Sequence, residues 1–409
     1  MRQYVALGLS MVLAATACVG SSAFAQATKL PNTKPANKKV VLRPGQTTPR
    51  AAQQPAATPA PRAVAQAAQQ PAAVKTFTIL YDWAPDVAEV KSMLEGAGAK
   101  PYMMIYQNVD PNAQATGKID VSKLIADVKQ RFGPNPSGWG MLDYEVPFDS
   151  VLQKGPSDPL YATCTSEMVN AIRKMKEAFP NVKWTYYGIP GLAYWPKSNL
   201  WELAPADIRA WETDRQITGY GPVLRELDWY SPCVYDCVDN SKSSANWKDP
   251  MLKNEHSYRK GRIEVVREFL RRNNLPMKPI IPSVTPFYAP GSNAIENGVI
   301  SAEEILRDQI IPVVAAEADG IAIWTCGNWY VQQATLPTNT NNSTQVRVRE
   351  EYKKGFLGGN EPAAWNTEGM KSTLLNKVGM SIAGMAKAAR DEFNRANANR
   401  TQTAAVTNK

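Results

Sequence analysis

The chain has 409 residues, of which 44% are hydrophobic and 20% are charged, so it can bury a sizeable core. This balance excludes a wholly disordered chain and a protein with many membrane spans. The formal net charge of +9 comes from Arg2 and from eight basic side chains in residues 26–75, because the remainder carries equal numbers of basic and acidic groups. We therefore expect no nucleic-acid partner for the folded part.

The first 25 residues are typical of a secretory signal peptide. Arg2 precedes the apolar run Val5–Ala17, and Ala23-Phe24-Ala25 offers small residues at a cleavage site. The apolar run is too short to span a bilayer as a mature helix. A lipid attached at Cys18 is an alternative to cleavage after residue 25, since small residues also precede this cysteine. The sequence thus predicts a secreted, periplasmic or envelope-associated protein without an integral membrane span.

Residues 26–75 are expected to be a disordered linker. They contain thirteen Ala, eight Pro and seven Gln, with no acidic and no aromatic residue. Such a segment cannot bury enough apolar surface to offset its ordering entropy. The composition also becomes polar near the C-terminus, so we expect a folded domain over residues 76–395 and a disordered tail over residues 396–409.

The side-chain inventory favours chemistry based on carboxylates and aromatic groups. A single histidine, His256, excludes Ser-His-Asp and Cys-His catalysis and a histidine-rich metal site, and no cofactor is implied. Eleven Trp and sixteen Tyr outnumber nine Phe, as in carbohydrate clefts, although ordinary packing would also use such rings. Four cysteines follow the leader, and an exported protein would pair them as two disulfides, in any of three ways. These cysteines are Cys164, Cys233, Cys237 and Cys326.

From residue 76 onward, short apolar runs alternate with amphipathic helical patterns. The expected strands are Phe77–Tyr81, Pro101–Tyr106, Gly138–Tyr144, Val182–Tyr187, Leu227–Tyr230, Pro279–Val284 and Gly320–Thr325. The expected helices are Asp86–Gly96, Asp120–Phe132, Pro159–Phe179, Pro205–Leu224, Tyr258–Asn273, Ala302–Ala316 and Glu368–Arg395. This alternation predicts an α/β fold, a single parallel (β/α)7–8 TIM-like barrel that is somewhat irregular. A doubly wound open sheet is the competitor, but Tyr81–Pro85 is no Gly-rich phosphate loop.

A barrel places its chemistry at the C-terminal ends of its strands, and these ends combine aromatic with polar residues. They read Tyr81-Asp82-Trp83, Tyr106-Gln107-Asn108, Asp143-Tyr144-Glu145, Tyr186-Tyr187-Gly188, Ser231-Pro232, Thr285-Pro286-Phe287-Tyr288 and Trp324–Trp329. We interpret this rim as a cleft that binds a polysaccharide or oligosaccharide. Within it, the period of two puts Asp143 and Glu145 on one face of their strand. Two neighbouring carboxylates disfavour joint ionisation, so one of them can serve as a general acid.

Four segments, in order, resemble segments of the hyaluronidases among the glycoside hydrolases, over about residues 76–350. They are Leu142–Glu145, which resembles an Asp-x-Glu strand end; Tyr186–Pro190, which resembles Tyr-Gly-Phe-Pro; Trp229–Tyr235, which resembles Leu-Tyr-Pro-Ser-Ile-Tyr; and Ala318–Trp324, which resembles Gly-Val-Val-Ile-Trp. The resemblance implies substrate-assisted, retaining hydrolysis of an N-acetylhexosamine-containing glycan. Glu145 would be the acid/base and Asp143 would orient the acetamido group. Tyr187, Tyr235 and Trp324 would shape the sugar subsite, with Asp82 beside them and Tyr230 as the alternative to Tyr235.

Two other functions remain open at this point. A conventional retaining glycosidase would use Glu145 as acid/base and Asp82 or Asp228 as nucleophile, with the carboxyl groups ~5–5.5 Å apart. A carbohydrate-binding barrel without catalysis would keep the aromatic cleft and need neither role.

Overall fold

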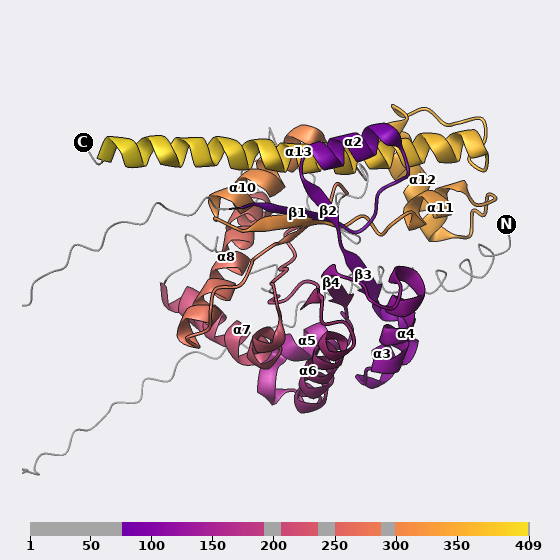
Figure 1. Ribbon diagram of the computed structural model, residues 1–409. Coiled ribbons are helices and arrows are strands. Elements are labelled where there is room, and N and C mark those ends of the chain that lie inside the picture. The colour runs from indigo at the N-terminus through magenta and orange to yellow at the C-terminus, as the bar shows by residue number, and fades with distance from the viewer. Residues whose placement is uncertain (1–75, 192–205, 236–249, 288–298, 408–409) are drawn as a thin grey trace, which may run out of the picture. The chain divides into compact units, whose positions relative to one another are not determined.

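The computed structural model describes residues 76–191, 206–235, 250–287 and 299–407 (Figure 1). The expected signal peptide, linker and lipid site at Cys18, and the cysteine Cys237, lie outside the described residues. In the described part the chain alternates strands and helices, and every strand ladder is parallel. The prediction of a parallel α/β fold is therefore confirmed. Within this part of the chain, no helix combines the length and hydropathy that a membrane crossing requires.

The strands of the described residues form two sheets. One sheet has the order β2-β1-β7-β6 and the other the order β3-β4-β5. The strands are β1 (Thr78–Tyr81), β2 (Ala99–Pro101), β3 (Met103–Tyr106), β4 (Gly138–Asp143), β5 (Val182–Tyr186), β6 (Ser283–Val284) and β7 (Gly320–Ile323).

Short connections join the two sheets at both of their margins. Only Tyr102 separates β2 from β3, and its amide donates to the carbonyl of Tyr81 at 3.0 Å. At the other margin, residues 230–233 lie between β5 and β6, linked by parallel bridges from Ser231 to Tyr187 and from Cys233 to Ser283. The expected strand at Leu227–Tyr230 is thus reduced to single bridges.

The structure therefore has two parallel sheets where the sequence predicted one closed barrel. The physical reason lies in the prolines of the joining segments. Pro232 and Pro279 lack the N–H that a ladder needs, so pairing of residues 230–233 with the strand that contains β6 is intermittent.

Helices follow most of the strands, and each of the seven expected helical stretches overlaps an observed helix. Their bounds are α2 (Ala88–Gly96), α4 (Val121–Phe132), α6 (Tyr161–Ala178), α7 (Ala206–Glu226), α8 (Pro250–Arg272), α9 (Ala302–Glu304) continued by the π-helix η5 (Ile305–Ile310) and α10 (Ile311–Ala315), and α13 (Glu368–Thr407). Among the described residues, four further α-helices were not predicted: α3 (Pro111–Thr116), α5 (Phe148–Lys154), α11 (Trp329–Thr335) and α12 (Ser343–Phe356).

The last helix, α13, is longer than the sequence predicted. It continues through residues 396–407, where a disordered tail was expected (Figure 1). Arg390 anchors it by donating to the carbonyls of Phe77 and Ala97, both at 2.9 Å, and Phe393 stacks on Phe77 with ring centroids 4.7 Å apart. Beyond residue 395, Arg400 lies 3.6 Å from the carboxylate of Glu317, which ties the added turns to the residues that precede β7.

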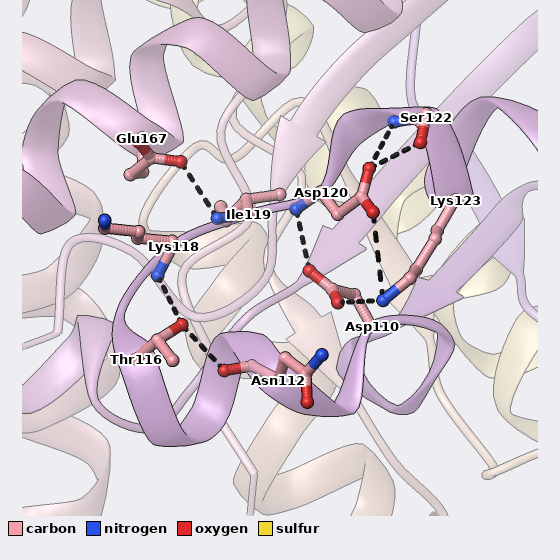
Figure 2. Close-up of polar contacts among 9 residues, drawn as sticks. All are labelled: Asp110, Asn112, Thr116, Lys118, Ile119, Asp120, Ser122, Lys123 and Glu167. Atoms are coloured by element: carbon pink, nitrogen blue, oxygen red, sulfur yellow. Dashed lines mark hydrogen bonds and ion pairs between the residues drawn. The ribbon is translucent and has the colours of Figure 1, made fainter.

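Polar contacts fix the connection between α3 and α4 (Figure 2). Asp110, which is 1% exposed, accepts from the amide of Asp120 at 2.7 Å and from Lys123 Nζ at 2.9 Å. Glu167 of α6 accepts from the amide of Ile119 at 2.9 Å. These bonds satisfy amides at the start of α4 and attach the segment after β3 to α6.

The prediction of two disulfides is wrong. Cys164 and Cys233 are free thiols, and two disulfides would need all four cysteines. Cys164 is fully buried on α6, and its Sγ faces Gly117, where an added Cβ would lie 3.2 Å away. Cys233 instead ends the bridging segment, and its Sγ accepts from the Tyr187 hydroxyl at 3.2 Å. The two thiols thus belong to different layers of the fold, a helix and a sheet edge.

Candidate active site

The C-terminal ends of neighbouring strands bring the predicted site residues to one edge of the sheets. Tyr106 pairs with Asp143 across β3 and β4, and the amide of Tyr187 donates to the carbonyl of Leu142 at 2.9 Å. In the other sheet, the amide of Asp82 donates to the carbonyl of Ile323 at 3.1 Å. Parallel pairing in register therefore places these strand ends at a common edge.

Three aromatic rings form a row along this edge. The rings of Tyr235 and Trp324 are stacked, with centroids 5.6 Å apart and an interplanar angle of 18°. Tyr187 continues the row, 5.9 Å from Tyr235 at 31°. Tyr235 and Trp324 are almost fully buried, whereas Tyr187 is half-buried. The structure thus assembles Tyr187, Tyr235 and Trp324 from three separate segments, and Tyr187 is the most accessible of them.

Tyr230 does not join the row. It is fully buried, and its hydroxyl donates to the carbonyl of Leu224 in α7 at 3.1 Å. Alternation along the segment explains the difference, because Ser231 contacts Ser283 across the bridges (2.8 Å between the two Oγ atoms), while Tyr230 faces the helices. Of the two tyrosines in this segment, only Tyr235 contacts the other aromatic residues of the site.

Asp82 lies at the centre of a hydrogen-bond network that joins the ends of β1 and β7. Its carboxylate accepts from the Thr325 amide at 3.1 Å, the Thr325 hydroxyl at 2.8 Å and the Gly327 amide at 3.3 Å. The Tyr106 hydroxyl donates to it at 3.4 Å and accepts from Trp324 Nε1 at 3.2 Å. Burial raises the pKa of Asp82 to about 6, and these donors oppose that rise.

Tyr102, which the sequence did not single out, and Tyr106, at one of the predicted strand ends, lie within electrostatic reach of Asp82 and Asp143. Burial raises the pKa of Tyr102 and of Tyr106, and the negative charges of both aspartates add to the rise. The Tyr102 hydroxyl is buried without a hydrogen-bond partner among the described residues. Leaving such a group unpaired costs about 1–3 kcal/mol. No local pattern marks Tyr102, since an apolar strand position is also an ordinary place for a tyrosine.

Asp143 and Glu145 act electrostatically on adjacent members of the aromatic row. Burial is the main cause of the raised pKa of Tyr235, and the Asp143 charge contributes to it. In Tyr187, burial again dominates, followed by Cys233 and Tyr235, and the Glu145 charge adds to the rise. Both carboxylates therefore lie within electrostatic reach of rings whose centroids are 5.9 Å apart.

Gln107, to which the sequence assigned no role of its own, holds the backbone around Glu145. Its Oε1 accepts from the Glu145 amide at 3.1 Å, and its Nε2 donates to the carbonyl of Val146 at 2.5 Å. Gln107 is 6% exposed and directly follows β3. The strand end Tyr106-Gln107-Asn108 was recognised in the sequence, but the contact joins residues 38 apart and has no local signature.

Asp228 lies apart from this edge. Its carboxylate accepts from Lys176 Nζ at 2.7 Å and from the amide of Trp184, within β5, at 2.9 Å. It is thus held against the middle of β5 by a lysine of α6. Among the described residues, no three His, Cys, Asp or Glu side chains gather as metal ligands.

The comparisons with known proteins give a distant structural likeness. No protein-family model matches the chain, and a search of curated proteins finds no match. Among solved structures, the chain is similar to bee venom hyaluronidase in complex with a hyaluronic acid tetramer, at 13% identity and a TM-score of 0.42. A monoclinic crystal structure of bee venom hyaluronidase gives 13% identity and a TM-score of 0.40. Each alignment covers 69% of this chain and 98% of the hyaluronidase chain.

Proposed function

We propose that the protein is a glycoside hydrolase that cleaves an N-acetylhexosamine-containing glycan. The observation that carries this proposal is the convergence of the Tyr187–Tyr235–Trp324 row with the charges of Asp143 and Glu145. Stacked rings suit the apolar faces of sugars, and two carboxylates supply the acid–base chemistry of glycosidic bond cleavage.

In the proposed reaction, Glu145 donates a proton to the glycosidic oxygen as the carbonyl oxygen of the substrate's acetamido group attacks the anomeric carbon. The bond to the leaving group breaks, and a cyclic oxazolinium ion forms. Asp143 accepts a hydrogen bond from the acetamido N–H and stabilises the positive charge that develops there. The Glu145 carboxylate then removes a proton from water, whose oxygen attacks the anomeric carbon and reopens the ring. Two inversions give net retention.

The same proposal covers the finer features of fold and location. The two sheets, joined through Tyr102 and through residues 230–233, would act as an irregular TIM-like barrel with the site at its C-terminal face. The leader and the linker expected in residues 1–75 would export the enzyme to the envelope or the medium. A polysaccharide or oligosaccharide is the partner proposed for the cleft.

Two observations favour substrate assistance over a nucleophile supplied by the protein. Asp228 is engaged by Lys176 and by the backbone of β5, away from the aromatic row. Asp82 accepts from four donors, which lowers its nucleophilicity and fits an anchoring role. A carbohydrate-binding protein without catalysis remains the alternative outcome of the test.

The test is a reducing-end assay on matched N-acetylated and de-acetylated glycans. The proposal expects new reducing ends from the acetylated glycan only, because a free amine removes the internal nucleophile. Equal activity on both forms would contradict substrate assistance and point to Asp82. Binding of the acetylated glycan without any cleavage would establish the binding protein instead.

A further inference from the structure

A polar network lies directly behind the candidate site, where α5 meets α7. Asp149, in the first turn of α5, accepts from the Tyr220 hydroxyl of α7 at 2.6 Å and from Gln153 Nε2 at 3.1 Å. Tyr220 is fully buried. The two helices approach this closely because Gly219 lacks a side chain, since an added Cβ would lie 2.1 Å from the carbonyl oxygen of Leu152.

This network supports two loops of the candidate site. The amide of Asp149 donates to the carbonyl of Glu145 at 2.6 Å. The first turn of α5 is therefore bonded to the backbone of the proposed acid/base. Gly191 ends the described part of the loop that follows Tyr187. A Cβ at Gly191 would lie 2.8 Å from Tyr220 Oη and 3.1 Å from Asp149 Oδ1, which shows that this loop rests on the network.

A third site segment is attached through α8. Arg262 Nη1 donates to the carbonyl of Cys233 at 2.7 Å, and Arg259 Nε donates to the carbonyl of Val234 at 3.2 Å. Both arginines are buried. Burial raises the pKa of Asp149, and the Tyr220 hydroxyl and the charge of Arg262 oppose that rise. The same segment is also bound by the site loop, because the Tyr187 hydroxyl donates to Cys233 Sγ at 3.2 Å.

We propose that Asp149 is a positioning residue of the active site. Its carboxylate, bound by Tyr220, fixes three segments relative to one another: the turn after Glu145, the Tyr187–Gly191 loop and, through the bond from the Tyr187 hydroxyl to Cys233 Sγ, residues 233–235. Asp149 acts through these segments and does not touch the substrate. The inference rests on the proposed function, because it assigns the alignment of Glu145 with the aromatic row to this one carboxylate.

Two variants remove the interaction with little change in volume. Asp149→Asn should lower kcat about 10-fold or more and change KM less than 2-fold, because small displacements of a catalytic group cost rate while outer sugar contacts remain. Tyr220→Phe should lower kcat less, since Gln153 still binds Asp149. The double variant should match Asp149→Asn alone, because both changes break one interaction. Glu226→Gln is the control: it breaks an exposed α6–α7 ion pair with Arg173 and should leave kcat unchanged.

A second readout does not depend on hydrolysis. Under native, reducing conditions, alkylation of Cys233 by iodoacetamide, followed by mass spectrometry, reports how firmly its segment is held. Asp149→Asn should speed labelling of Cys233 several-fold and leave the buried Cys164 of α6 unchanged. If the wild type cleaves no glycan, the proposed function fails, and the labelling still tests the network.

Three results would overturn the positioning role. The first is unchanged labelling of Cys233 in Asp149→Asn, and the second is faster labelling with an unchanged kcat. The third is equal acceleration at Cys164 and Cys233, which would mean general loosening of the fold. If Asp149→Asn does not fold, Tyr220→Phe is judged by the same three criteria.

Discussion

Asp82 shows how one carboxylate can have a structural role at the candidate site. Four donors from Tyr106, Thr325 and Gly327 converge on it, yet burial still raises its pKa to about 6. The network joins β1 to the turn after β7 and holds Tyr106, which accepts from Trp324. Asp82 therefore fixes one end of the aromatic row, a role that its place after a strand could not reveal.

The raised pKa of Asp82 predicts a pH-dependent stability. The folded protein holds this proton up to about pH 6, whereas the unfolded chain releases it near pH 4, so unfolding free energy should fall as pH rises from 4 to 6. The contribution is about 3 kcal/mol, present below pH 4 and lost above pH 6. The unfolding free energy of Asp82→Asn, measured with urea at several pH values, should lack this decrease between pH 4 and 6. Identical slopes in the wild type and Asp82→Asn would contradict the assigned pKa.

Glu145 carries the clearest catalytic prediction. Glu145→Gln keeps the shape of the side chain and removes the proton that the leaving group needs, so kcat should fall about 10²–10⁴-fold while glycan binding persists. Turnover and the binding isotherm of an N-acetylated oligosaccharide measure the two effects. Glu177→Gln, on an exposed turn of α6, is the control. Unchanged turnover in Glu145→Gln would remove the whole site assignment.

At the scale of elements, hydrophobic periodicity predicted helices correctly where the amphipathic pattern was long. The amphipathic stretches that form α4 and α6 differ from prediction by one or two residues at their ends. The short helices α5 and α11 follow strand ends, where polar and proline residues interrupt the apolar period, and were missed. Alternation predicts that Asp143 and Glu145 share a face, whereas the contacts of Gln107 and Asp149 join segments that no local pattern connects.

The packing of β4 on β5 gives a prediction at this scale. Gly140 lies against the fully buried Trp184, and an added Cβ would be 2.4 Å from the indole ring. Gly140→Ala should therefore destabilise the fold by about 1–3 kcal/mol, measured as a lower urea midpoint with an unchanged m-value. Gly96→Ala is the matched control, because a Cβ there meets no atom within 4 Å. Equal midpoints for the two variants would show that β5 can shift at no cost.

For the whole molecule, the order of strands was predictable and the continuity of the sheets was not. The alternation of strands and helices predicts parallel pairing, but whether ladders close depends on which amides prolines remove at the joins. The disulfide prediction failed for a similar reason. It rested on the expected export and an even number of cysteines, whereas Cys164 occupies a buried position on a helix. Compartment and composition do not specify where a side chain lies.

The helix α13 packs the end of the domain against its beginning. A substitution at this contact should lower the stability of the fold and leave activity unchanged. Phe393 is 5% exposed and stacks on Phe77, which precedes β1. Phe393→Ala should cost about 3–5 kcal/mol through lost burial and the cavity that remains.

Activity should respond differently. Asp82 follows the other end of β1, about 16 Å along the strand at its usual rise per residue. The kcat of Phe393→Ala, measured well below its melting temperature, should therefore equal that of the wild type. Val346→Ala, on an exposed position of α12, is the control for both measurements. A kcat that falls in proportion to the lost stability would instead mean that α13 stabilises the candidate site as well as the fold.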